Sequence, residues 1–214
     1  MPYNEYKSRY TYKGTDVLIN KLNIKNQELL DKFERVVTTY NLSKLYIKPT
    51  EGNFDLDHLC SIHKYLFGSL YDFAGEIRDE CIQKGSTLFC RPGYIYPYSK
   101  TILEEMKKRI VNIECEEDLI KYLAHYYSEL NIIHPFRDGN GRTIREFLRQ
   151  YVLYINTKID FGTFEIDFTN ITEEDKMILL KGSEISAITT KTELLEIFFA
   201  KTLIKKTEKR LKHL

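Results

Sequence analysis

The sequence predicts an all-α domain that carries one short β-hairpin. Apolar residues recur three and four positions apart along most of the chain, which is the period of a helix with one buried face. Only residues 81–98 combine glycine and proline with threonine, leucine and aromatic residues, a composition typical of a hairpin. The 214 residues, 43% of them hydrophobic, are enough to bury one core, and no linker-like stretch divides them. We therefore expect a single domain over residues 1–214.

The first third of the chain is expected to form three helices. A helix over residues 15–24 begins at a candidate threonine cap, and a second over 26–40 carries apolar residues at helical spacing. A proline- and glycine-containing turn at 49–53 precedes the third helix, over 55–68. Gly68 suits the C-terminal cap of that helix.

Helical periodicity resumes after the hairpin and predicts five further helices. These segments are residues 101–113, 117–133, 140–155, 172–184 and 191–212. The last segment ends in the basic sequence LIKKTEKRLKHL, which we interpret as a solvated helix face. In that interpretation Leu203, Ile204 and Leu211 turn toward the core.

The charge balance argues against a partner that binds through bulk electrostatics. Lysine and arginine number 32 and aspartate and glutamate 31, so the formal net charge is +1 and neither nucleic acid nor an anionic membrane is expected. The N-terminus lacks the apolar run of a signal peptide, and no stretch approaches the roughly 20 apolar residues of a membrane span. We expect a cytoplasmic protein, although delivery by a dedicated secretion system would need no such signal. The four cysteines lack zinc-ligand spacing and are expected to be free thiols.

The most informative segment runs from His134 to Arg145 and reads HPFRDGNGRTIR. An apolar helical pattern leads up to it, and Pro135 disfavours helical dihedral angles at the histidine before it. Phe136 is apolar and is expected to anchor the loop in the core. Helical periodicity returns after the turn-rich DGNG stretch. The segment therefore predicts a helix, a tight loop and the start of a second helix.

A helix start with glycines is suited to bind phosphate. Its first backbone N–H groups lack partners and carry a partial positive charge, and glycine lets an anion approach them closely. Arg142 and Arg145 are three positions apart and so lie on one face of the helix. Two guanidinium groups beside a helix start favour a polyphosphate over a single carboxylate.

Two side chains beside this helix start supply further chemistry. Asp138 is a candidate Mg²⁺ ligand, because Mg²⁺ usually takes one or two carboxylates together with phosphate oxygens. His134 is a candidate general base for an attacking hydroxyl, since its ordinary pKa is near 6.5. Each residue also has a plain structural interpretation, such as a loop histidine, a turn, a helix cap or a solvated arginine face. Their concurrence within twelve residues favours phosphoryl-type transfer.

The same residues match the signature of the Fic family, H-x-F-x-[DE]-G-N-G-R-x-x-R, at every specified position. Upstream, HKYLFGSLYDFAGEIRDECIQKGSTLF resembles the helix, loop and β-hairpin "flap" that precede this motif in the family. The resemblance covers about residues 55–200, so residues 1–54 would form an N-terminal helical extension. The stretch TYKGTDVLINKLNIKN is similar to the opening of Fic toxins of toxin–antitoxin modules and of secreted Fic effectors.

The resemblance implies a role for each motif residue. His134 would be the general base, Arg145 would bind and align the γ-phosphate, and Asp138 would hold Mg²⁺. The flap, about Lys84 to Phe89, would clamp a target protein's backbone by β-strand addition. The nucleotide-binding residues would be Lys84, Gly85, Asp138, Gly139, Asn140, Gly141, Arg142 and Arg145.

The implied reaction is transfer of AMP from ATP to a Ser, Thr or Tyr hydroxyl of a target protein, with release of pyrophosphate. A kinase-like branch of the family carries lysine at the second glycine of the motif, so Gly141 favours AMP transfer. Transfer of UMP or phosphocholine, removal of AMP, and a catalytically silent scaffold that binds only nucleotide or a partner remain alternatives. Family members differ in oligomeric state, so the motif implies no particular one.

Many Fic enzymes are similar in being inhibited by a helix with the pattern [ST]-x-x-x-E-[GN], whose glutamate pairs with the second motif arginine. In this chain Thr192 and Glu196 have the required spacing near the C-terminus, but neither glycine nor asparagine follows. We expect Glu196 to lie in a core helix. Inhibition in trans by a small antitoxin, or no inhibition, is therefore the favoured hypothesis.

Overall fold

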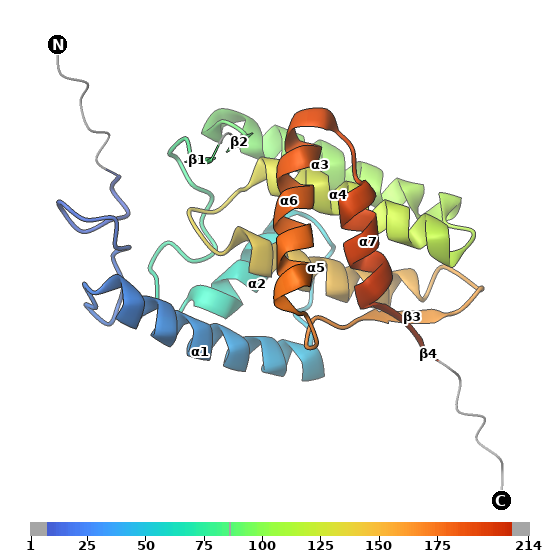
Figure 1. The fold of residues 1–214 in the computed structure, drawn as a ribbon, viewed down its shortest axis with the longest axis horizontal. Coiled ribbons are helices and arrows are strands. Elements are labelled where there is room, and N and C mark those ends of the chain that lie inside the picture. Colours follow the sequence, from blue (N-terminus) through green and yellow to red (C-terminus); the bar gives the residue numbers. More distant parts are fainter. Residues whose placement is uncertain (1–7, 86, 207–214) are drawn as a thin grey trace, which may run out of the picture.

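A computed structural model gives the fold of the chain and describes residues 8–85 and 87–206 (Figure 1). The fold is all-α, as the sequence predicts, and carries two small antiparallel strand pairs rather than the one hairpin that was expected. The α-helices are α1 Gln27–Ile47, α2 Leu56–Phe67, α3 Pro92–Lys108, α4 Glu116–Ile133, α5 Asn140–Ile155, α6 Glu173–Thr189 and α7 Glu193–Thr202. A short 3-10 helix, η1 Arg109–Asn112, follows α3.

Helix α5 occupies the centre of the core. Residues on nearly all of its sides are buried, and it packs against α2 on one side and α4 on another. Helix α1 lies against α2 at one side of the molecule, and α6 and α7 pair with each other and with α4 (Figure 1). Because α5 begins right after the motif loop, this packing fixes where the helix start points.

The hairpin expected after residue 81 forms from β1 Gln83–Lys84 and β2 Thr87–Leu88, with Gln83 opposite Leu88. A second pair, β3 Thr163–Ile166 and β4 Leu203–Lys206, was not predicted. Phe164 and Leu203 of that pair are buried in the core. The two strands are far apart in the sequence, so no local sequence pattern predicts that they pair.

The predicted helix over residues 15–24 is wrong. This stretch forms turns and a single bridge between Thr11 and Leu18. The Asn20 side chain donates to the carbonyls of Leu18 and Ile24 and accepts from the Ile24 N–H. Such side-chain bonds satisfy the backbone without a helix, which is why asparagine favours turns.

The expected extent of the hairpin region, residues 81–98, is also too long, because α3 begins at Pro92. Proline suits the first position of a helix, where its missing N–H would have no partner. Ile95 and Ser99 already belong to the buried face that continues through α3. The tyrosines at 94, 96 and 98 resemble strand residues in composition, but Tyr94 and Tyr96 are exposed on the helix.

Three further helix ends differ from the sequence prediction, one of them being the end of α6, which runs to Thr189 rather than 184. Helix α1 runs to residue 47 rather than 40, because Leu45 continues its buried face and no breaker occurs before Pro49. The helix predicted over 191–212 ends at Thr202, and residues 203–206 are strand β4. Leu203 does reach the core, Ile204 is exposed, and Leu211 lies outside the described residues.

All four cysteines are free thiols. Among the described residues, no helix has both the length and the apolar character needed to cross a membrane.

A buried ion pair on α5 ties this central helix to α1. The Arg149 guanidinium donates to both carboxylate oxygens of Glu146, at 2.8 and 2.7 Å, and also to the Leu45 carbonyl at the end of α1. Both side chains are almost fully buried, with exposed fractions of 6% and 3%. Gln150 donates to the same carboxylate.

We expect Glu146→Leu to lower the free energy of unfolding by about 3–5 kcal/mol, because it leaves the Arg149 charge buried without its partner. The double variant Glu146→Leu/Arg149→Leu should recover a large part of that loss, since no unpaired charge remains. Urea denaturation followed by circular dichroism measures both values. The account would be contradicted if the double variant lost as much free energy of unfolding as Glu146→Leu and Arg149→Leu lose together when measured singly.

Candidate active site

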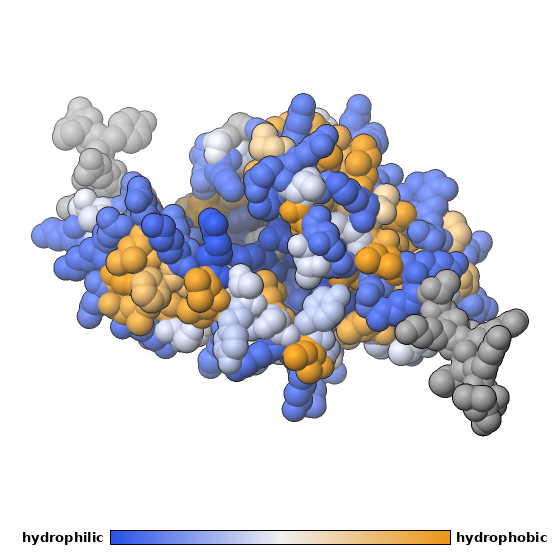
Figure 2. Space-filling view, turned by 60° about the horizontal axis from the view of Figure 1, so that its bottom comes forward, coloured by the Kyte–Doolittle hydropathy of each residue, from blue (hydrophilic) through white to orange (hydrophobic). Residues whose placement is uncertain are grey.

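A cavity of about 810 Å³ lies between the start of α5, the flap and α6. A volume in this range accommodates a nucleotide-sized ligand. Figure 2 shows a hollow on this face whose walls are mostly hydrophilic. All the residues predicted to form the site line this one cavity: Lys84, Gly85, His134, Asp138, Gly139, Asn140, Gly141, Arg142 and Arg145.

The backbone turns sharply at His134, as the following proline predicts. Helix α4 ends at Ile133, and His134 has φ 46° and ψ 61°, the left-handed conformation that a non-glycine residue rarely adopts. Its N–H still donates to the Leu130 carbonyl at 3.1 Å, which closes the last turn. The turn directs the imidazole from the end of the helix into the cavity.

The imidazole of His134 is held in one tautomer. Its Nδ1 is 2.9 Å from the Asn131 carbonyl, an acceptor, so Nδ1 carries the proton and Nε2 keeps its lone pair. The ring stacks on Phe89 at the base of the flap, with centroids 3.7 Å apart and planes 18° apart. Burial lowers the pKa of His134 to about 4, and the nearby Arg78 cation acts in the same direction. The side chain is therefore a neutral base at physiological pH.

Sequence reasoning missed Arg78, which holds the His134 turn in place. The Arg78 side chain is 1% exposed, and its guanidinium donates to the carbonyls of His134 at 2.8 Å, Glu80 at 2.6 Å and Cys90. Its backbone N–H donates to the Pro135 carbonyl at 2.9 Å. One buried side chain therefore joins the end of α4 to both ends of the flap segment.

The loop between α4 and α5 is fixed by its own side chains. Phe136 is fully buried, as expected of a core anchor. Asn140 is 2% exposed, and its amide both accepts from the Phe136 N–H at 2.9 Å and donates to the Phe136 carbonyl at 2.8 Å. The Asn140 side chain therefore shapes the loop, and only its backbone N–H remains for an anion.

His63 of α2 is a second residue that sequence reasoning missed. Its ring stacks on Phe136 with centroids 3.9 Å apart, and the Gly75 N–H donates to its Nδ1. Nε2 therefore carries the proton and donates to the Asp138 carbonyl at 2.9 Å. Burial lowers the pKa of His63 to about 4, so it stays neutral and supports the loop from below. No sequence signal singles out His63, because the buried face of α2 carries a second histidine, His58.

Helix α5 starts without a side-chain cap. Gly139 precedes its first residue with φ 75°, and no side chain accepts a hydrogen bond from the first turn. A Cβ at Gly139 would come within 2.5 Å of the Phe67 ring, so this position requires glycine for its conformation and for space. The first N–H groups of α5 face the cavity lined by Asn140, Gly141 and Arg142 and form a ready anion site.

Both motif arginines reach the cavity from α5. A Cβ at Gly141 would lie 3.3 Å from Nη1 of Arg145, so the Arg145 guanidinium rests directly over this glycine. Arg142 lies over the Phe67 ring, 4.7 Å from its centroid, and forms an ion pair with Glu34 of α1. The two guanidinium groups and the helix start concentrate positive charge at one end of the cavity.

Asp138 has the exposure and position of a metal ligand at this cavity. It is exposed, and one of its carboxylate oxygens accepts from the Gly139 N–H at 2.5 Å, which orients the group. No cluster of three or more His, Cys, Asp or Glu side chains that could hold a metal occurs in the described part of the chain. A single carboxylate fits Mg²⁺ that takes its other ligands from phosphate and water, but not a metal held by protein alone.

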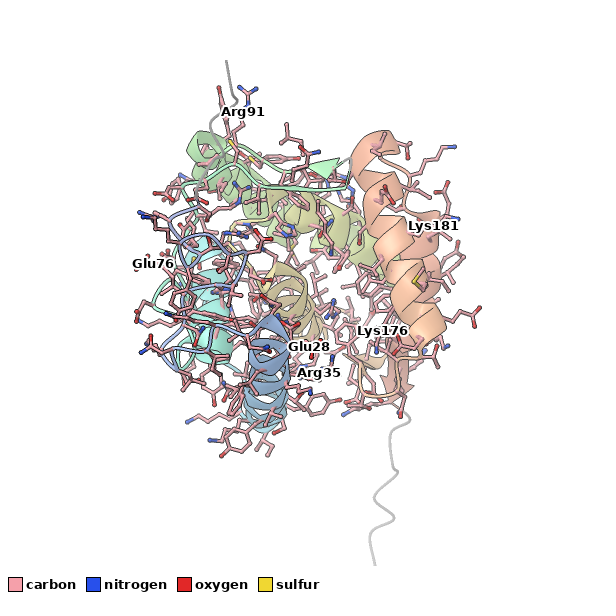
Figure 3. All side chains as sticks on the ribbon, turned by 60° about the vertical axis from the view of Figure 1, so that its left-hand side comes forward. Glu28, Arg35, Glu76, Arg91, Lys176 and Lys181 are labelled. Carbon is pink, nitrogen blue, oxygen red and sulfur yellow. The ribbon has the colours of Figure 1, made fainter. Side chains whose placement is uncertain are left out.

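The far wall of the cavity was not predicted. Helix α6 contributes Met177, Leu179, Leu180, Lys181, Ser183 and Glu184 to the lining. Figure 3 shows α6, with Lys181 labelled beside it, on the right of the view, and α1, with Glu28 and Arg35 labelled, nearer the centre. Apolar residues occur on several sides of α6, so its sequence did not indicate which face meets the cavity.

Glu196 lies in α7, as expected, and is not among the cavity-lining residues. The Thr192 hydroxyl donates to its carboxylate at 2.8 Å. The carboxylate therefore faces its own helix start rather than Arg145.

Comparison with known proteins agrees with this geometry. Residues 53–152 match the model of the Fic/DOC family. The chain is 33% identical to "Probable protein adenylyltransferase y4lH" of Sinorhizobium fredii over 165 residues, which cover 76% of this chain and 84% of the relative. It is 35% identical to "Protein adenylyltransferase VbhT" of Bartonella schoenbuchensis over 158 residues, covering 73% of this chain and 33% of that longer protein.

A solved structure shows the same fold. The Bartonella tribocorum effector BepC, crystallised with AMPPNP, superimposes with a TM-score of 0.80 at 21% identity, covering 92% of this chain and 97% of that one. Fold and motif geometry thus define a protein of the Fic class. With the sequence similarity, they establish that this chain belongs to the Fic/DOC family.

We expect Gly139→Ala to lower the free energy of unfolding by about 2 kcal/mol or more, because an alanine at this φ is strained and its Cβ collides with Phe67. The variant should also lose nucleotide binding, since the helix start must shift. Gly93→Ala in α3 is the matched control, because no atom lies within 4 Å of the added Cβ. Urea denaturation and calorimetric titration with AMPPNP give the two quantities, and equal behaviour of the two variants would contradict this account.

Proposed function

We propose that this protein transfers AMP from ATP to a hydroxyl side chain of a target protein. One observation carries the proposal: a neutral imidazole with an unprotonated Nε2 shares a nucleotide-sized cavity with an uncapped helix start and two guanidinium groups. The names of the relatives, protein adenylyltransferases, support the same activity. Positioning and charge stabilisation are the main demands of such a transfer.

In the proposed reaction His134 is the general base. The target hydroxyl oxygen bonds to the α-phosphorus of ATP, its proton passes to Nε2 of His134, and the bond from the α-phosphorus to the leaving pyrophosphate breaks. The Nδ1–H of His134 keeps donating its hydrogen bond to the Asn131 carbonyl, which stabilises the imidazolium that forms. The N–H groups at the start of α5 and the side chains of Arg142 and Arg145 would bind the phosphate oxygens.

Asp138 would hold Mg²⁺ together with the phosphate chain. The ion, when bound, neutralises negative charge on the phosphates. The Gly139 N–H, which donates to the Asp138 carboxylate, keeps that group beside the helix start.

The flap would receive the target protein. Its strands β1 and β2 have only each other as partners among the described residues, and Leu88 is 58% exposed. An extended target segment can pair with such a strand through its backbone, which brings its hydroxyl to His134. Lys84 and Gly85 line the cavity from the flap and would also contact the nucleotide.

Because Glu196 bonds to Thr192 and does not line the cavity, we propose either inhibition in trans by a small antitoxin or no inhibition. In the first case the inhibitory carboxylate for Arg145 comes from a second chain. Structural neighbours of this chain are described as translocated Bartonella effectors, which supports the proposal of delivery into another cell after synthesis in the cytoplasm.

We expect label from ATP marked at the α-phosphate, and none from ATP marked at the γ-phosphate, to become bound to proteins of a lysate. His134→Ala should reduce this labelling by about 10²-fold or more, because the general base is lost. His125→Ala, which removes an imidazole that does not line the cavity, is the control and should keep the wild-type rate. Label from the γ-phosphate would instead indicate a kinase, and nucleotide binding without label would indicate a silent scaffold.

The lowered pKa of His134 predicts how the rate depends on pH. The base must be unprotonated, and with a pKa of about 4 it stays so over the whole neutral range. The rate of AMP transfer should therefore be level between about pH 5.5 and pH 8. Phe89→Ala exposes the His134 imidazole, so the pKa of His134 should rise toward about 6.5. The variant should then lose activity as the pH falls through that value.

The control for this profile is Leu88→Ala, which removes the exposed neighbour of Phe89 on the flap and should keep the wild-type profile. The profile is measured as kcat/KM for labelled AMP transfer at constant ionic strength. Identical profiles for wild type and Phe89→Ala would show that stacking on Phe89 does not set the protonation of His134.

A further inference from the structure

Helix α1 reaches the nucleotide cavity through one ion pair. Glu34, in the middle of this helix, accepts a hydrogen bond from Nη2 of Arg142 at 2.6 Å. The contact is largely shielded from solvent, with side-chain exposures of 13% for Glu34 and 27% for Arg142. The family model begins only at residue 53, so this contact comes from outside the segment that defines the family.

Glu34 is itself held in place. Its second carboxylate oxygen accepts from the hydroxyl of Tyr71, a side chain that is 2% exposed. One turn along α1, the buried Thr38 hydroxyl accepts from Nη1 of Arg142 at 3.4 Å. With the Phe67 ring 4.7 Å from the guanidinium carbon, groups from α1 and α2 fix the plane of the Arg142 side chain.

The side from which Glu34 contacts Arg142 shows whether its carboxylate supports phosphate binding or competes with the phosphate for the guanidinium. Arg142 lines the cavity, whereas Glu34 and Tyr71 do not. The Glu34 carboxylate therefore meets the guanidinium from the side of α1, away from the space that a phosphate chain would fill. A guanidinium has five N–H donors in one plane, so two can bond to α1 while others remain for phosphate oxygens.

We propose that Glu34 is a positioning residue for Arg142, and that through it α1 forms part of the nucleotide site. The inference rests on the proposed function in that the bound anion is the phosphate chain of ATP. An unrestrained arginine must lose rotamer freedom when it binds phosphate, and Glu34 removes that loss by ordering the side chain beforehand. The ordered Arg142 side chain contributes to nucleotide binding. Loss of the Glu34 contact should therefore lower the affinity for nucleotide and leave the rate of the chemical step nearly unchanged.

The test compares variants of the full chain. Glu34→Ala should raise the Kd for AMPPNP with Mg²⁺ and the KM for ATP by about tenfold, with kcat within about twofold of wild type. Glu34→Gln should stay within about threefold of wild type, because its amide oxygen still accepts from Arg142 and its NH₂ can donate to Tyr71. Glu28→Ala, an exposed carboxylate on the same helix, is the matched control and should change neither value.

A double-variant cycle tests whether Glu34 acts through Arg142. In an Arg142→Lys background, Glu34→Ala should add less than about a twofold further loss of affinity, because the planar fork that it orders is gone. If Glu34→Ala does not fold, Tyr71→Phe replaces it. That variant keeps the carboxylate, removes one of its restraints, and should raise the Kd about threefold.

Unchanged affinity in Glu34→Ala, or in Tyr71→Phe where Glu34→Ala is unfolded, would overturn the inference. Tighter binding and faster transfer in both Glu34→Ala and Glu34→Gln would also overturn it, because that result describes a competing carboxylate. The proposed function fails separately, if wild type binds AMPPNP but transfers no α-label. In that case the Kd values still decide whether Glu34 positions Arg142.

Discussion

The site depends on one constraint, the open start of helix α5. Gly139 adopts a left-handed conformation that the Phe67 ring restricts to glycine, and no side chain caps the first turn. Because α5 is buried on nearly all sides, its N-terminus cannot be shifted without disturbing the core. The Asn140 side chain and His63 hold the preceding loop through backbone bonds. The core thus maintains unpaired N–H groups that a phosphate can satisfy.

His134, the proposed general base, is neutral beside the proposed phosphate site. Burial lowers the pKa of His134 and the Arg78 cation acts in the same direction, so the imidazole remains neutral while its Nδ1–H donates to the Asn131 carbonyl. The largely shielded carboxylate of Glu34 forms an ion pair with the Arg142 guanidinium and does not line the cavity, which is why we propose that it orders that side chain. The guanidinium groups of Arg142 and Arg145 therefore line the cavity, and Glu34, the counterion of Arg142, lies outside it.

The sequence predicted the site better than the fold around it. The motif is contiguous, so the loop, the helix start and their chemistry could be inferred from local rules, and the residues named there share one cavity. Arg78, His63 and the α6 wall come from distant segments and act through tertiary contacts that no spacing reveals. The errors in the predicted elements have local causes. The Asn20 side chain bonds to backbone groups in a turn where a helix was expected. Pro92 begins a helix in a region rich in strand-forming residues. Strands β3 and β4 pair across nearly 40 residues.

The most direct test of the account follows the backbone amides at the start of α5. In ¹H–¹⁵N spectra of the full chain titrated with AMPPNP and Mg²⁺, the amides of Asn140, Gly141 and Arg142 should show the largest shifts, because they would donate to the phosphate chain. They should saturate with the same Kd as the nucleotide measured by calorimetry. Binding that leaves these three amides unmoved would contradict the central claim. Largest shifts at the amides of Arg109 and Lys121, which line a separate, smaller cavity, would contradict it as well.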